Sequence, residues 1–395
     1  MNLLMVSPNI PSPTAGASTR NYYLLKALAC KHSVSLLALG VDEDKGVPCD
    51  ASLLEDLTRS VQVITLPKSS PKRWQQLVGV VRGKSYVLKA YTLVEMQDAL
   101  EAALTSGHYD AVLFESVLMA GYHLPKDVKV IIDEHNIEYE LRLRTYQHET
   151  ALLRKWYNRL ESSLLKPVEI ERCRNADAVL VTSERERFAL QSALPGNLIE
   201  VVPNGVDIQI FNGHCATQEV PGRIIFTGSM EYYPNVHAVL FFARQCWPLI
   251  RAQVPHATWQ IVGKNPLPEV QRLAELPGVT VTGTVPDVRP YLSSAVVSIV
   301  PLLIGSGTRL KILEALAMRR AVVSTSIGCE GLSVVSGEHL EVTDQPEAFA
   351  QAVVTFMNDP ELRKTFGNAG RKLVEAEYSW ERCGAQLLNV LEKIS

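Results

Sequence analysis

The sequence predicts an α/β fold with two doubly wound domains that face each other across a cleft. Short apolar runs rich in β-branched residues alternate with longer segments of helical periodicity, which is typical of a parallel sheet wrapped by helices. The alternation occurs in both halves of the chain, and 395 residues are too many for one typical core. We therefore expect a first domain over residues 1–202 and a second over residues 203–379.

The pattern places strands and helices in order along each half. In the first half, strands are expected at 3–7, 33–39, 61–66, 111–115, 130–133 and 178–182, with helices at 19–30, 94–104 and 141–174. In the second half, strands are expected at 223–227, 258–262, 279–282, 296–300 and 321–324, with helices at 236–253, 308–318, 345–358 and 361–377. Because proline lacks the N–H that a helix interior needs, the helix over 141–174 is expected to kink or break at Pro167.

The boundary between the two domains is expected at the segment 203–207. Asn204 and Gly205 together favour a turn, and Pro203 prevents a helix from running across the junction. The tail over 380–395 has an amphipathic pattern, with Leu387 and Leu391 on one face, and is expected to pack back on the first domain. Ligands of open α/β sheets bind at the carboxyl ends of strands, so site residues should directly follow strands.

Composition argues against a nucleic-acid-binding, a membrane-spanning or a secreted protein. A hydrophobic content of 47% with 21% charged residues is ordinary for a globular chain, and a net charge of −3 gives no reason to expect a nucleic-acid partner. No apolar run is long enough for a membrane-spanning helix, and the first residues lack the pattern of a secretion signal. The seven cysteines are scattered without a Cys-x-x-Cys pair, which fits a reducing cytoplasm. We expect a cytoplasmic location.

The most informative stretch follows the expected strand ending at Val300. Gly305, Ser306 and Gly307 form a loop, and a helix is expected to begin near Thr308. Backbone amides at such a helix start are unpaired and carry the positive end of the helix dipole, and glycines let a phosphate approach them closely. The loop is therefore predicted to bind a phosphate group.

Three charged side chains follow this loop. Arg309 and Lys311 add full positive charge, and Glu314 lies in an otherwise apolar Leu-Glu-Ala-Leu-Ala helix. Glu314 is expected to face a ligand hydroxyl or a basic partner. The alternative is a glycine loop that caps a surface helix, with Glu314 in solvent.

A second glycine loop, over 7–20, joins the first strand to the first helix. Gly16 permits close backbone approach, and Arg20 can reach the expected cleft from the first helical turn. Many α/β proteins begin in this way without binding a phosphate, so a purely structural loop is the alternative.

Polar residues follow two further strands of the first half. The apolar run 130–132 leads directly into Asp133, Glu134, His135 and Asn136, which is typical of a strand end that faces a cleft. Asp133 and Glu138 could orient His135 or raise its pKa, although a lone histidine is more often structural. Glu115 ends the preceding strand, either as a site carboxylate or as a helix-start residue.

Two charged segments raise the questions of metal binding and of membrane contact. The acidic run over 42–44 resembles a metal-binding Asp-x-Asp, but the lysine, glycine and proline after it favour a solvated loop. We expect no metal, because backbone amides, Arg309 and Lys311 can neutralise a diphosphate. The basic stretch over 68–91, with interleaved apolar residues, favours either peripheral contact with an anionic membrane or a helix with a solvated basic face.

Together these motifs resemble the retaining glycosyltransferases of family 4, whose GT-B fold has two Rossmann-like domains. The run over 228–235 and Trp247-Pro248 are similar to sugar transferases of bacterial exopolysaccharide clusters. The resemblance spans nearly the whole chain and rests on the loop around Gly16 and on segments 133–136, 176–183, 203–207, 226–230, 262–263, 281–285 and 311–317.

The resemblance implies a role for several residues. Glu314 matches a glutamate that holds the donor ribose, Gly307 and Thr308 match amides around the diphosphate, and His135 matches a histidine beside the donor sugar. The remaining donor-binding positions that we infer are Gly16, Arg20, Gly228, Ser229, Gly263, Val285, Ser306, Arg309 and Lys311, with Val285 near the nucleobase. Of these residues, His135, Lys311 and Glu314 are expected to be catalytic, whereas Glu115 and Asn136 are expected to bind the acceptor.

Two positions depart from the family pattern. Ser306 stands where the family has the first glutamate of its paired-glutamate motif, which normally contacts the transferred sugar. Ser229 and Met230 follow Gly228, where an arginine and a lysine are usual, so Arg309 and Lys311 are the expected substitutes for that charge.

The expected function is a metal-independent, hexosyltransferase-like enzyme of polysaccharide or glycoconjugate biosynthesis. It would retain anomeric configuration and move a sugar from a nucleotide-sugar, such as a UDP- or GDP-sugar, to a saccharide or lipid-linked acceptor, without a further cofactor. The alternatives are a nucleotide-sugar epimerase or phosphorylase on the same architecture, and a non-catalytic nucleotide-sugar-binding protein.

Overall fold

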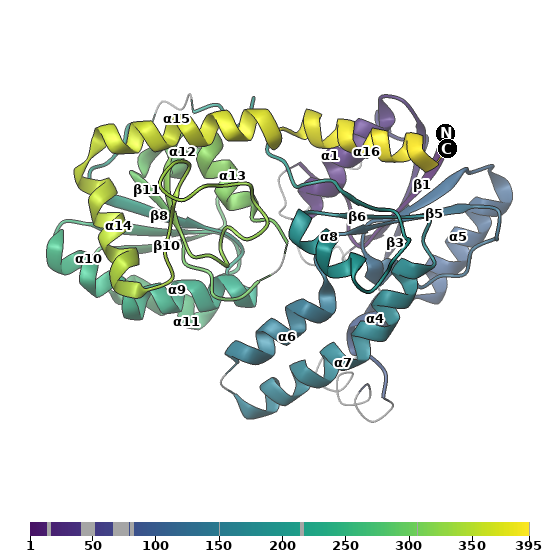
Figure 1. Cartoon of the computed structure of the whole chain (residues 1–395), viewed down its shortest axis with the longest axis horizontal. Coiled ribbons are helices and arrows are strands. Elements are labelled where there is room, and N and C mark those ends of the chain that lie inside the picture. The colour runs from purple at the N-terminus through teal and green to yellow at the C-terminus, as the bar shows by residue number, and fades with distance from the viewer. Residues whose placement is uncertain are drawn as a thin grey trace. The chain divides into compact units, whose positions relative to one another are not determined.

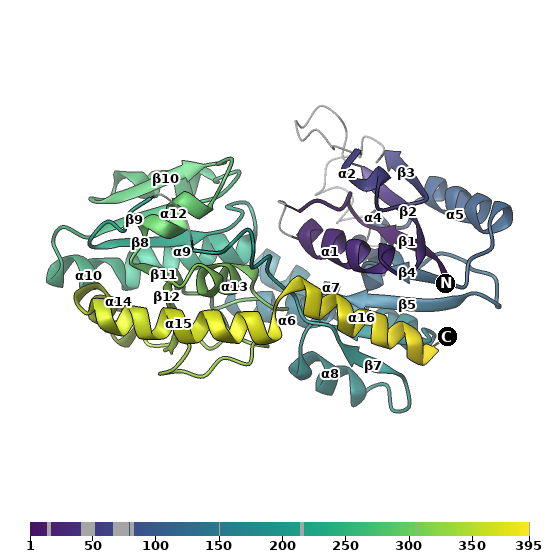
Figure 2. The same cartoon turned by 90° about the horizontal axis from the view of Figure 1, so that it is seen from above.

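The computed structural model describes residues 1–13, 17–40, 52–65, 79, 83–149, 151–213, 217–305 and 307–394. The chain divides into two compact units (Figures 1 and 2). Unit 1 is formed by Met1–Pro203 and Cys383–Ser395, and unit 2 by Asn204–Arg382. Each unit is a parallel sheet with helices, which confirms the α/β prediction of two doubly wound domains.

In the described residues of unit 1, a seven-stranded parallel sheet has the order β3-β2-β1-β4-β5-β6-β7. Its strands are β1 (Asn2–Ser7), β2 (Ser33–Gly40), β3 (Ser60–Thr65), β4 (Ala111–Phe114), β5 (Lys129–Glu134), β6 (Ala178–Val181) and β7 (Ile199–Val201). The helices are α1 (Ala17–Ala29), α2 (Ser52–Glu55), α4 (Tyr86–Ala90), α5 (Val94–Ser106), the 3-10 turn η2 (Val117–Met119), α6 (Glu138–His148), α7 (Leu152–Arg174) and α8 (Glu184–Gln191).

The core of unit 1 has a layer on each face of this sheet. Successive side chains of a strand point to opposite faces, so in β1 Leu3 and Met5 pack on one side and Leu4 and Val6 on the other. The first layer also contains Leu387 and further apolar residues of the last helix, α16 (Trp380–Ile394). That helix therefore belongs to the core of unit 1 for most of its length.

In the described residues of unit 2, a six-stranded parallel sheet has the order β10-β9-β8-β11-β12-β13, which can be followed across Figure 2 as far as β12. Its strands are β8 (Arg223–Thr227), β9 (Thr258–Val262), β10 (Val279–Gly283), β11 (Val297–Val300), β12 (Ala321–Ser324) and β13 (Glu341–Val342). The helices are α9 (Tyr233–Gln245), α10 (Trp247–Gln253), α11 (Pro268–Gln271), the 3-10 turn η3 (Arg272–Glu275), α12 (Arg289–Ser294), α13 (Leu310–Ala317), α14 (Pro346–Asn358) and α15 (Pro360–Glu377).

Two expected helices are divided in the structure. The segment over 236–253 forms α9 and α10, which meet at Cys246, because Pro248 cannot donate the hydrogen bond that would continue α9. The segment over 141–174 is interrupted between His148 and Leu152, and α7 runs on through Pro167. A break at Pro167 was therefore the wrong expectation. Pro167 is exposed, and contacts with α6 on both sides of it hold the helix in place.

Candidate functional site

In unit 2 the strand order reverses between β8 and β11, which are neighbours in the sheet. Ligands of open α/β sheets bind beyond the carboxyl ends of strands at such a reversal. β8 ends at Thr227 and β11 at Val300, so Gly228 and the loop from Pro301 leave the sheet at the same edge. Several of the donor-binding residues predicted from the sequence lie at this edge.

Two glycines bring the backbones after β8 and β9 into close contact. Gly228 and Gly263 have φ values of 148° and 158°, which L side chains rarely adopt. A Cβ on Gly263 would lie 1.7 Å from the carbonyl oxygen of Gly228, and a Cβ on Gly228 would lie 2.9 Å from Nζ of Lys311. The absence of side chains here leaves the Lys311 ammonium next to the backbone of the loop after β8.

Lys311 occupies a defined position at this edge. Its side chain rises from the first turn of α13, and Nζ donates a hydrogen bond of 2.8 Å to Oδ1 of Asn235. The same ammonium lies 4.0 Å from the ring centroid of Phe226, a cation–π contact. Asn235 is in turn held by its Nδ2, which donates to the Ser229 carbonyl at 3.0 Å. The network fixes one positive charge beside the loop after β8.

The charge state of Lys311 is sensitive to its surroundings. Burial, together with the nearby Arg309 guanidinium, lowers the pKa of Lys311 to about 7, while Glu314 acts in the opposite direction. Burial raises the pKa of Glu314 to about 7, although Lys311 favours its ionised form. Among the described residues, none donates a hydrogen bond to the Glu314 carboxylate. Its oxygens therefore remain available to ligand hydroxyls.

The loop before α13 is held from two sides. α13 begins at Leu310, two residues later than expected, and Arg309 is its N-cap residue. Thr308 is buried, and its Oγ1 accepts a hydrogen bond of 3.0 Å from Nδ2 of Asn204. Nη1 of Arg309 donates to the Gly307 carbonyl, so this guanidinium bends back over its own loop. Ser306 lies outside the described residues.

Two other expected donor-binding residues of unit 2 lie at the same edge with weaker contacts. Oγ of Ser229 donates to Glu231 at 3.4 Å. Val285 follows β10 and packs partly buried against the unit 2 core. Asn235 was missed from sequence, because its place beside Pro234 at the start of an apolar helix does not indicate its contact with Lys311.

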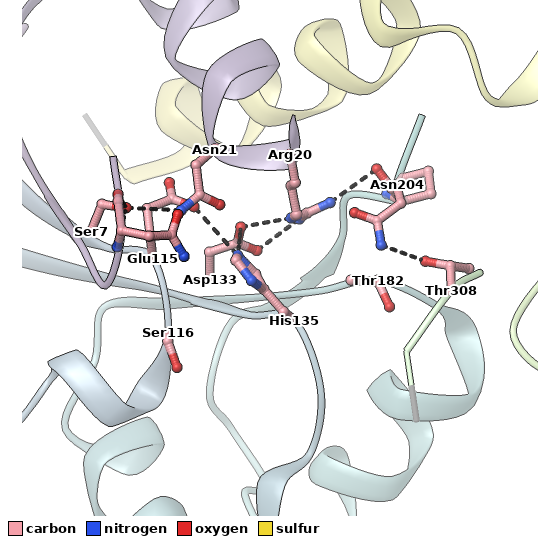
Figure 3. A network of polar contacts seen from close by, with 12 residues as sticks. Ser7, Arg20, Asn21, Glu115, Ser116, Asp133, His135, Thr182, Asn204 and Thr308 are labelled. Carbon is pink, nitrogen blue, oxygen red and sulfur yellow. Dashed lines mark hydrogen bonds and ion pairs between the residues drawn. The ribbon is translucent and has the colours of Figure 1, made fainter. Parts of the chain in front are cut away.

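In unit 1 the strand order reverses between β1 and β4, and β5 lies next to β4. Glu115 directly follows β4, and Asp133 lies near the end of β5, one residue before the strand ends at Glu134. Figure 3 shows these carboxylates and His135 gathered beneath Arg20 of α1. Three of the residues expected to form a site therefore share one position at the carboxyl edge of this sheet.

Arg20 and Asp133 form a buried, bidentate ion pair. Nε and Nη2 of Arg20 donate to the two carboxylate oxygens of Asp133, each at 2.7 Å, and Nη1 donates to the Pro203 carbonyl at 3.1 Å. Arg20 is 2% exposed and Asp133 is fully buried. In this structure Arg20 acts on Asp133, and its contact with a donor stays a prediction.

Two carboxylates stabilise the protonated, positively charged form of His135. Its Nε2 lies 3.0 Å from Oδ2 of Asp133 and 3.4 Å from Oε2 of Glu115. Burial would lower the pKa of His135, but Asp133 and Glu115 outweigh it and raise that pKa to about 9. Asp133 and Glu115, and not Glu138, are thus the carboxylates that lie within hydrogen-bond distance of the ring.

The pKa values of the two carboxyl groups are shifted in opposite directions. Burial would raise the pKa of Asp133, but Arg20 and His135 hold it well below the usual range of an aspartate. Burial raises the pKa of Glu115 to about 6, with His135 acting in the opposite direction. Oε1 of Glu115 is buried and has no hydrogen-bond partner among the described residues. The group can therefore present a charged imidazolium and a carboxyl oxygen to a polar ligand.

Glu115, Asp133 and His135 also satisfy a simple geometric test for a metal site. One ligand atom from each lies within 4.8 Å of the others, the only such group of three or more in the described parts of the chain. Both oxygens of Asp133, however, already accept hydrogen bonds from the Arg20 guanidinium. The negative charge that would attract a cation is therefore largely compensated.

Several expectations fall on residues that the structure does not describe. Gly16, the acidic run over 42–44 and most of the basic stretch over 68–91 lie outside the described residues. Of that stretch, Lys84 and Lys89 are described and exposed. Asn136 follows His135 and is partly exposed. No described helix combines the length and the apolar character needed to cross a membrane.

Comparisons with known proteins agree with the two-unit fold. Residues 14–210 match the family model described as Glycosyltransferase Family 4, and residues 221–359 match Glycosyl transferases group 1. The matched segments correspond closely to units 1 and 2. Between them they cover most of the chain.

Curated relatives are distant. An uncharacterized 44.6 kDa protein in the cps region of Klebsiella pneumoniae is 23% identical over 72% of this chain and 75% of its own length. The lipopolysaccharide core biosynthesis mannosyltransferase LpcC of Rhizobium leguminosarum bv. viciae is 26% identical over 53% of this chain and 62% of its own length.

Solved structures share the whole fold. Sucrose-phosphate synthase from Thermosynechococcus elongatus is similar with a TM-score of 0.74 at 17% identity, covering 100% of this chain and 99% of that one. HepE from Anabaena, solved in complex with UDP and glucose, has a TM-score of 0.67 at 15% identity, covering 98% of this chain and 99% of that one.

Proposed function

The chain belongs to the family 4 glycosyltransferases with the GT-B fold, and from this we infer that it is a retaining hexosyltransferase that uses a nucleoside diphosphate sugar. The observation that carries the donor assignment is the Lys311 ammonium, fixed beside Gly228 and Gly263 where β8 and β11 end. A charge held against bare backbone at a strand reversal suits a diphosphate. The Anabaena relative in this fold binds UDP, which supports the same ligand class here.

Lys311 would act on the leaving group. As the bond between sugar and diphosphate breaks, negative charge grows on the diphosphate oxygens, and a fixed ammonium stabilises that charge more than it stabilises the bound substrate. Asn235 and the Phe226 ring hold the ammonium in place before the substrate arrives. Lys311 is therefore expected to increase the rate of turnover more than it increases the affinity for the donor.

Glu314 would hold the ribose. Its carboxylate lies one turn after Lys311 on α13 and accepts no hydrogen bond from the described residues. Ribose hydroxyls donate hydrogen bonds that a carboxylate accepts well, and the charge on Lys311 favours the ionised form of Glu314. Together the two side chains account for the nucleotide half of the donor.

His135 would position the transferred sugar. With its pKa raised to about 9, the ring is protonated at neutral pH and donates hydrogen bonds to sugar oxygens, so it does not serve as a base or a covalent nucleophile. Glu115 and Asn136 at the same strand ends are proposed to contact the acceptor. Retention of anomeric configuration would follow from attack on the face that the diphosphate leaves.

Metal independence is part of the same proposal. Lys311 supplies positive charge to the diphosphate, and Arg20 already compensates Asp133, so neither site requires a divalent ion. Turnover should persist unchanged in excess chelator. A loss of activity that added magnesium or manganese restores would overturn this point.

The acceptor is proposed to be a saccharide or a lipid-linked saccharide of a surface polysaccharide. The relatives from the Klebsiella cps region and from Rhizobium lipopolysaccharide core biosynthesis support this class. An epimerase would convert the donor without any acceptor, so product analysis with labelled donor separates the two functions.

A binding experiment tests the donor site directly. Calorimetric titration of UDP and GDP should give a clear affinity for one of them, and Lys311→Met should weaken that affinity about tenfold or more. Lys372→Met, on the exposed surface of α15, is the matched control and should bind as the native chain does. Native affinity in Lys311→Met, with folding intact, would place the diphosphate elsewhere.

A further inference from the structure

α6 and α7 form a helical hairpin that extends away from the seven-stranded sheet of unit 1 (Figure 1). α7 is 23 residues long, and its buried residues begin only at Asn158. Between Leu152 and Tyr157 no side chain is buried, so the first turn and a half of α7 lies beyond the packed part of the unit. This end of the hairpin, residues 151–160 with the end of α6, is called the tip below.

Polar contacts hold the hairpin rigid along its length. Near the sheet, the buried Glu169 carboxylate accepts hydrogen bonds from the first two backbone N–H groups of α6, at 2.8 and 3.0 Å. In the middle, Ser162 donates to the Tyr139 carbonyl at 2.8 Å. At the tip, Lys155 and Arg159 lie over the Tyr146 ring, 5.2 and 5.6 Å from its centroid. The tip is thus a defined surface.

Large apolar side chains cover the outer side of the tip. Leu152 is 81% exposed, Leu153 86% and Trp156 57%. At about 100° of rotation per helical residue, these three form a stripe about 100° wide, roughly opposite the face through which α7 packs on its unit at Glu161 and Leu165. This stripe is not an edge of the core, because the helix turns it away from the core.

Positive charge lies beside the stripe. Arg154, Lys155 and Arg159 lie within two turns of it on α7, whereas on α6 Arg144 is paired with Glu140 at 3.9 Å and Nε of Arg142 is buried. The one acidic side chain of the described residues between Leu141 and Leu160 is Glu149, which is buried and accepts from the Ala151 N–H. A monomeric surface rarely presents such a tryptophan–leucine patch beside a group of basic side chains.

We propose that the tip docks on the surface of an anionic lipid bilayer. Leucine and tryptophan side chains enter the interface between headgroups and acyl chains, while arginine and lysine reach the lipid phosphates. The charge favours this partner over a second copy of the chain, because two such basic tips would repel each other. This surface differs from the stretch over 68–91, and it needs no spanning helix.

The position of the hairpin suits the proposed acceptor. α6 begins at Glu138, three residues after His135, and its 11 residues span about 16 Å. A bilayer at the tip would therefore keep the carboxyl edge of the unit 1 sheet within a short distance of the lipid surface. This step alone depends on the proposed function, because it takes the acceptor to be lipid-linked.

Vesicle binding by the full chain tests the docking without any turnover. Vesicles of phosphatidylcholine and phosphatidylglycerol at about 7 to 3 should sediment the native chain, and pure phosphatidylcholine vesicles should bind it at least about tenfold more weakly. Leu152→Ser/Leu153→Ser and Arg154→Glu/Lys155→Glu should each lower partitioning into anionic vesicles about tenfold or more.

A matched control removes exposed apolar side chains elsewhere on unit 1. Val94 and Phe188 are 72% and 67% exposed, on α5 and α8, and Val94→Ser/Phe188→Ser should bind vesicles as the native chain does. Equal losses in the control and in Leu152→Ser/Leu153→Ser would overturn the proposal. So would a chain that ignores anionic vesicles and instead self-associates through Leu152 and Leu153 in sedimentation velocity.

Tryptophan fluorescence gives an independent measurement. Of the five tryptophans, Trp74 lies outside the described residues, Trp247, Trp259 and Trp380 are buried, and Trp156 is exposed. In a Trp74→Phe background, anionic vesicles should therefore shift the emission to shorter wavelength through Trp156. The shift should disappear in Trp156→Phe, while that variant still sediments with the vesicles. An unchanged shift in Trp156→Phe would mean that the tip does not enter the interface. Loss of donor binding would leave all these results untouched, so this proposal and the proposed function fail separately.

Discussion

At the residue scale, the guanidinium of Arg20 determines how the polar group of unit 1 is charged. It pairs with both oxygens of Asp133, and Asp133 in turn holds a proton on His135. Arg20, Asp133 and His135 are all buried or nearly so, and removing any one of them would leave its partner in a poorly solvated site at a cost in folding free energy.

Breaking this pair should destabilise unit 1 strongly. Asp133→Asn leaves the buried Arg20 charge without its carboxylate, and we expect the free energy of unfolding to fall by about 3–5 kcal/mol. Urea unfolding followed through the unit 1 transition measures the change. Arg187→Met, which removes a more exposed partner of Glu184, should cost less than about 1 kcal/mol. Similar losses in the two variants would mean that the buried pair contributes no more than a surface pair.

Lys311 and Glu314 should make donor binding depend on pH in opposite directions. Lys311, with a pKa of about 7, loses its charge as the pH rises through that value, which weakens binding of a diphosphate. Glu314, also with a pKa of about 7, gains its charge over the same range, which strengthens binding of ribose hydroxyls. In the native chain the two effects should partly cancel.

Variants should separate the two titrations. In Glu314→Gln, nucleotide affinity should fall as pH rises from 6 to 8, and the fall should begin at lower pH because Glu314 no longer supports the charge on Lys311. In Lys311→Met, affinity should instead rise with pH. Calorimetric titration of the preferred nucleotide across this range gives both slopes, approaching about tenfold per pH unit beyond the pKa. Parallel slopes in the two variants would contradict these assignments.

The sequence indicated some of these residues and not others, for a physical reason. Glu115 and His135 directly follow strands, and Lys311 begins the helix after the loop that leaves β11. Because the carboxyl ends of parallel strands meet at one edge, their location was predictable. The contacts of Asn235 with Lys311 and of Arg20 with Asp133 join residues far apart in the chain. Such partners depend on tertiary packing, which a single sequence pattern does not report.

At the scale of elements, buried strands were easier to predict than helix ends. β1, β2 and β8 agree with their predicted ranges within one residue, because a fully buried parallel strand has a continuous apolar run. β7 and β13 have only three and two residues, too few for a pattern. The break before Leu152 has no glycine or proline to mark it, whereas Pro167 marked a break that packing overrides.

Replacing Pro167 should therefore stabilise α7. Pro167→Ala restores a backbone N–H in the helix interior, and we expect the free energy of unfolding of unit 1 to rise by about 1–2 kcal/mol after the proline's effect on the unfolded chain is subtracted. Thermal unfolding by circular dichroism measures it. Glu171→Ala, an exposed change on the same helix, should alter stability by less than about 0.5 kcal/mol. A less stable Pro167→Ala variant would mean that the hairpin depends on the proline.

At the scale of the whole molecule, the last helix completes a core that begins with the first strand. Leu387 and Leu391 of α16 pack in the same cluster as Leu3 and Leu24, although more than 350 residues separate them in the chain. Two domains were predictable from length and alternation, and the amphipathic tail indicated a buried face. Which residues that face meets required the structure.

Truncating this packing should affect one unit selectively. Leu387→Ala and Leu391→Ala should each lower the stability of unit 1 by about 2–5 kcal/mol, because each leaves a cavity in a fully packed layer. Calorimetry should show the unit 1 transition shifted down while the stabilisation of unit 2 by its nucleotide persists. Leu53→Ala, at a side chain that is 49% exposed, is the control and should shift neither transition appreciably. A joint shift of both transitions would show that the units unfold together.

The chain passes from one unit to the other twice, after Pro203 and again after Arg382. The two passages run side by side where they leave unit 2, since the Val206 N–H donates to the Tyr378 carbonyl at 2.8 Å and Val206 bridges to Ser379. A recombinant chimera that exchanges the donor-binding half between relatives therefore needs two crossovers, with residues 383–394 kept from the parent that supplies the first half. A single crossover would graft a foreign helix onto Leu24 and its neighbours, so natural shuffling of donor specificity in this architecture has to preserve that short terminal segment.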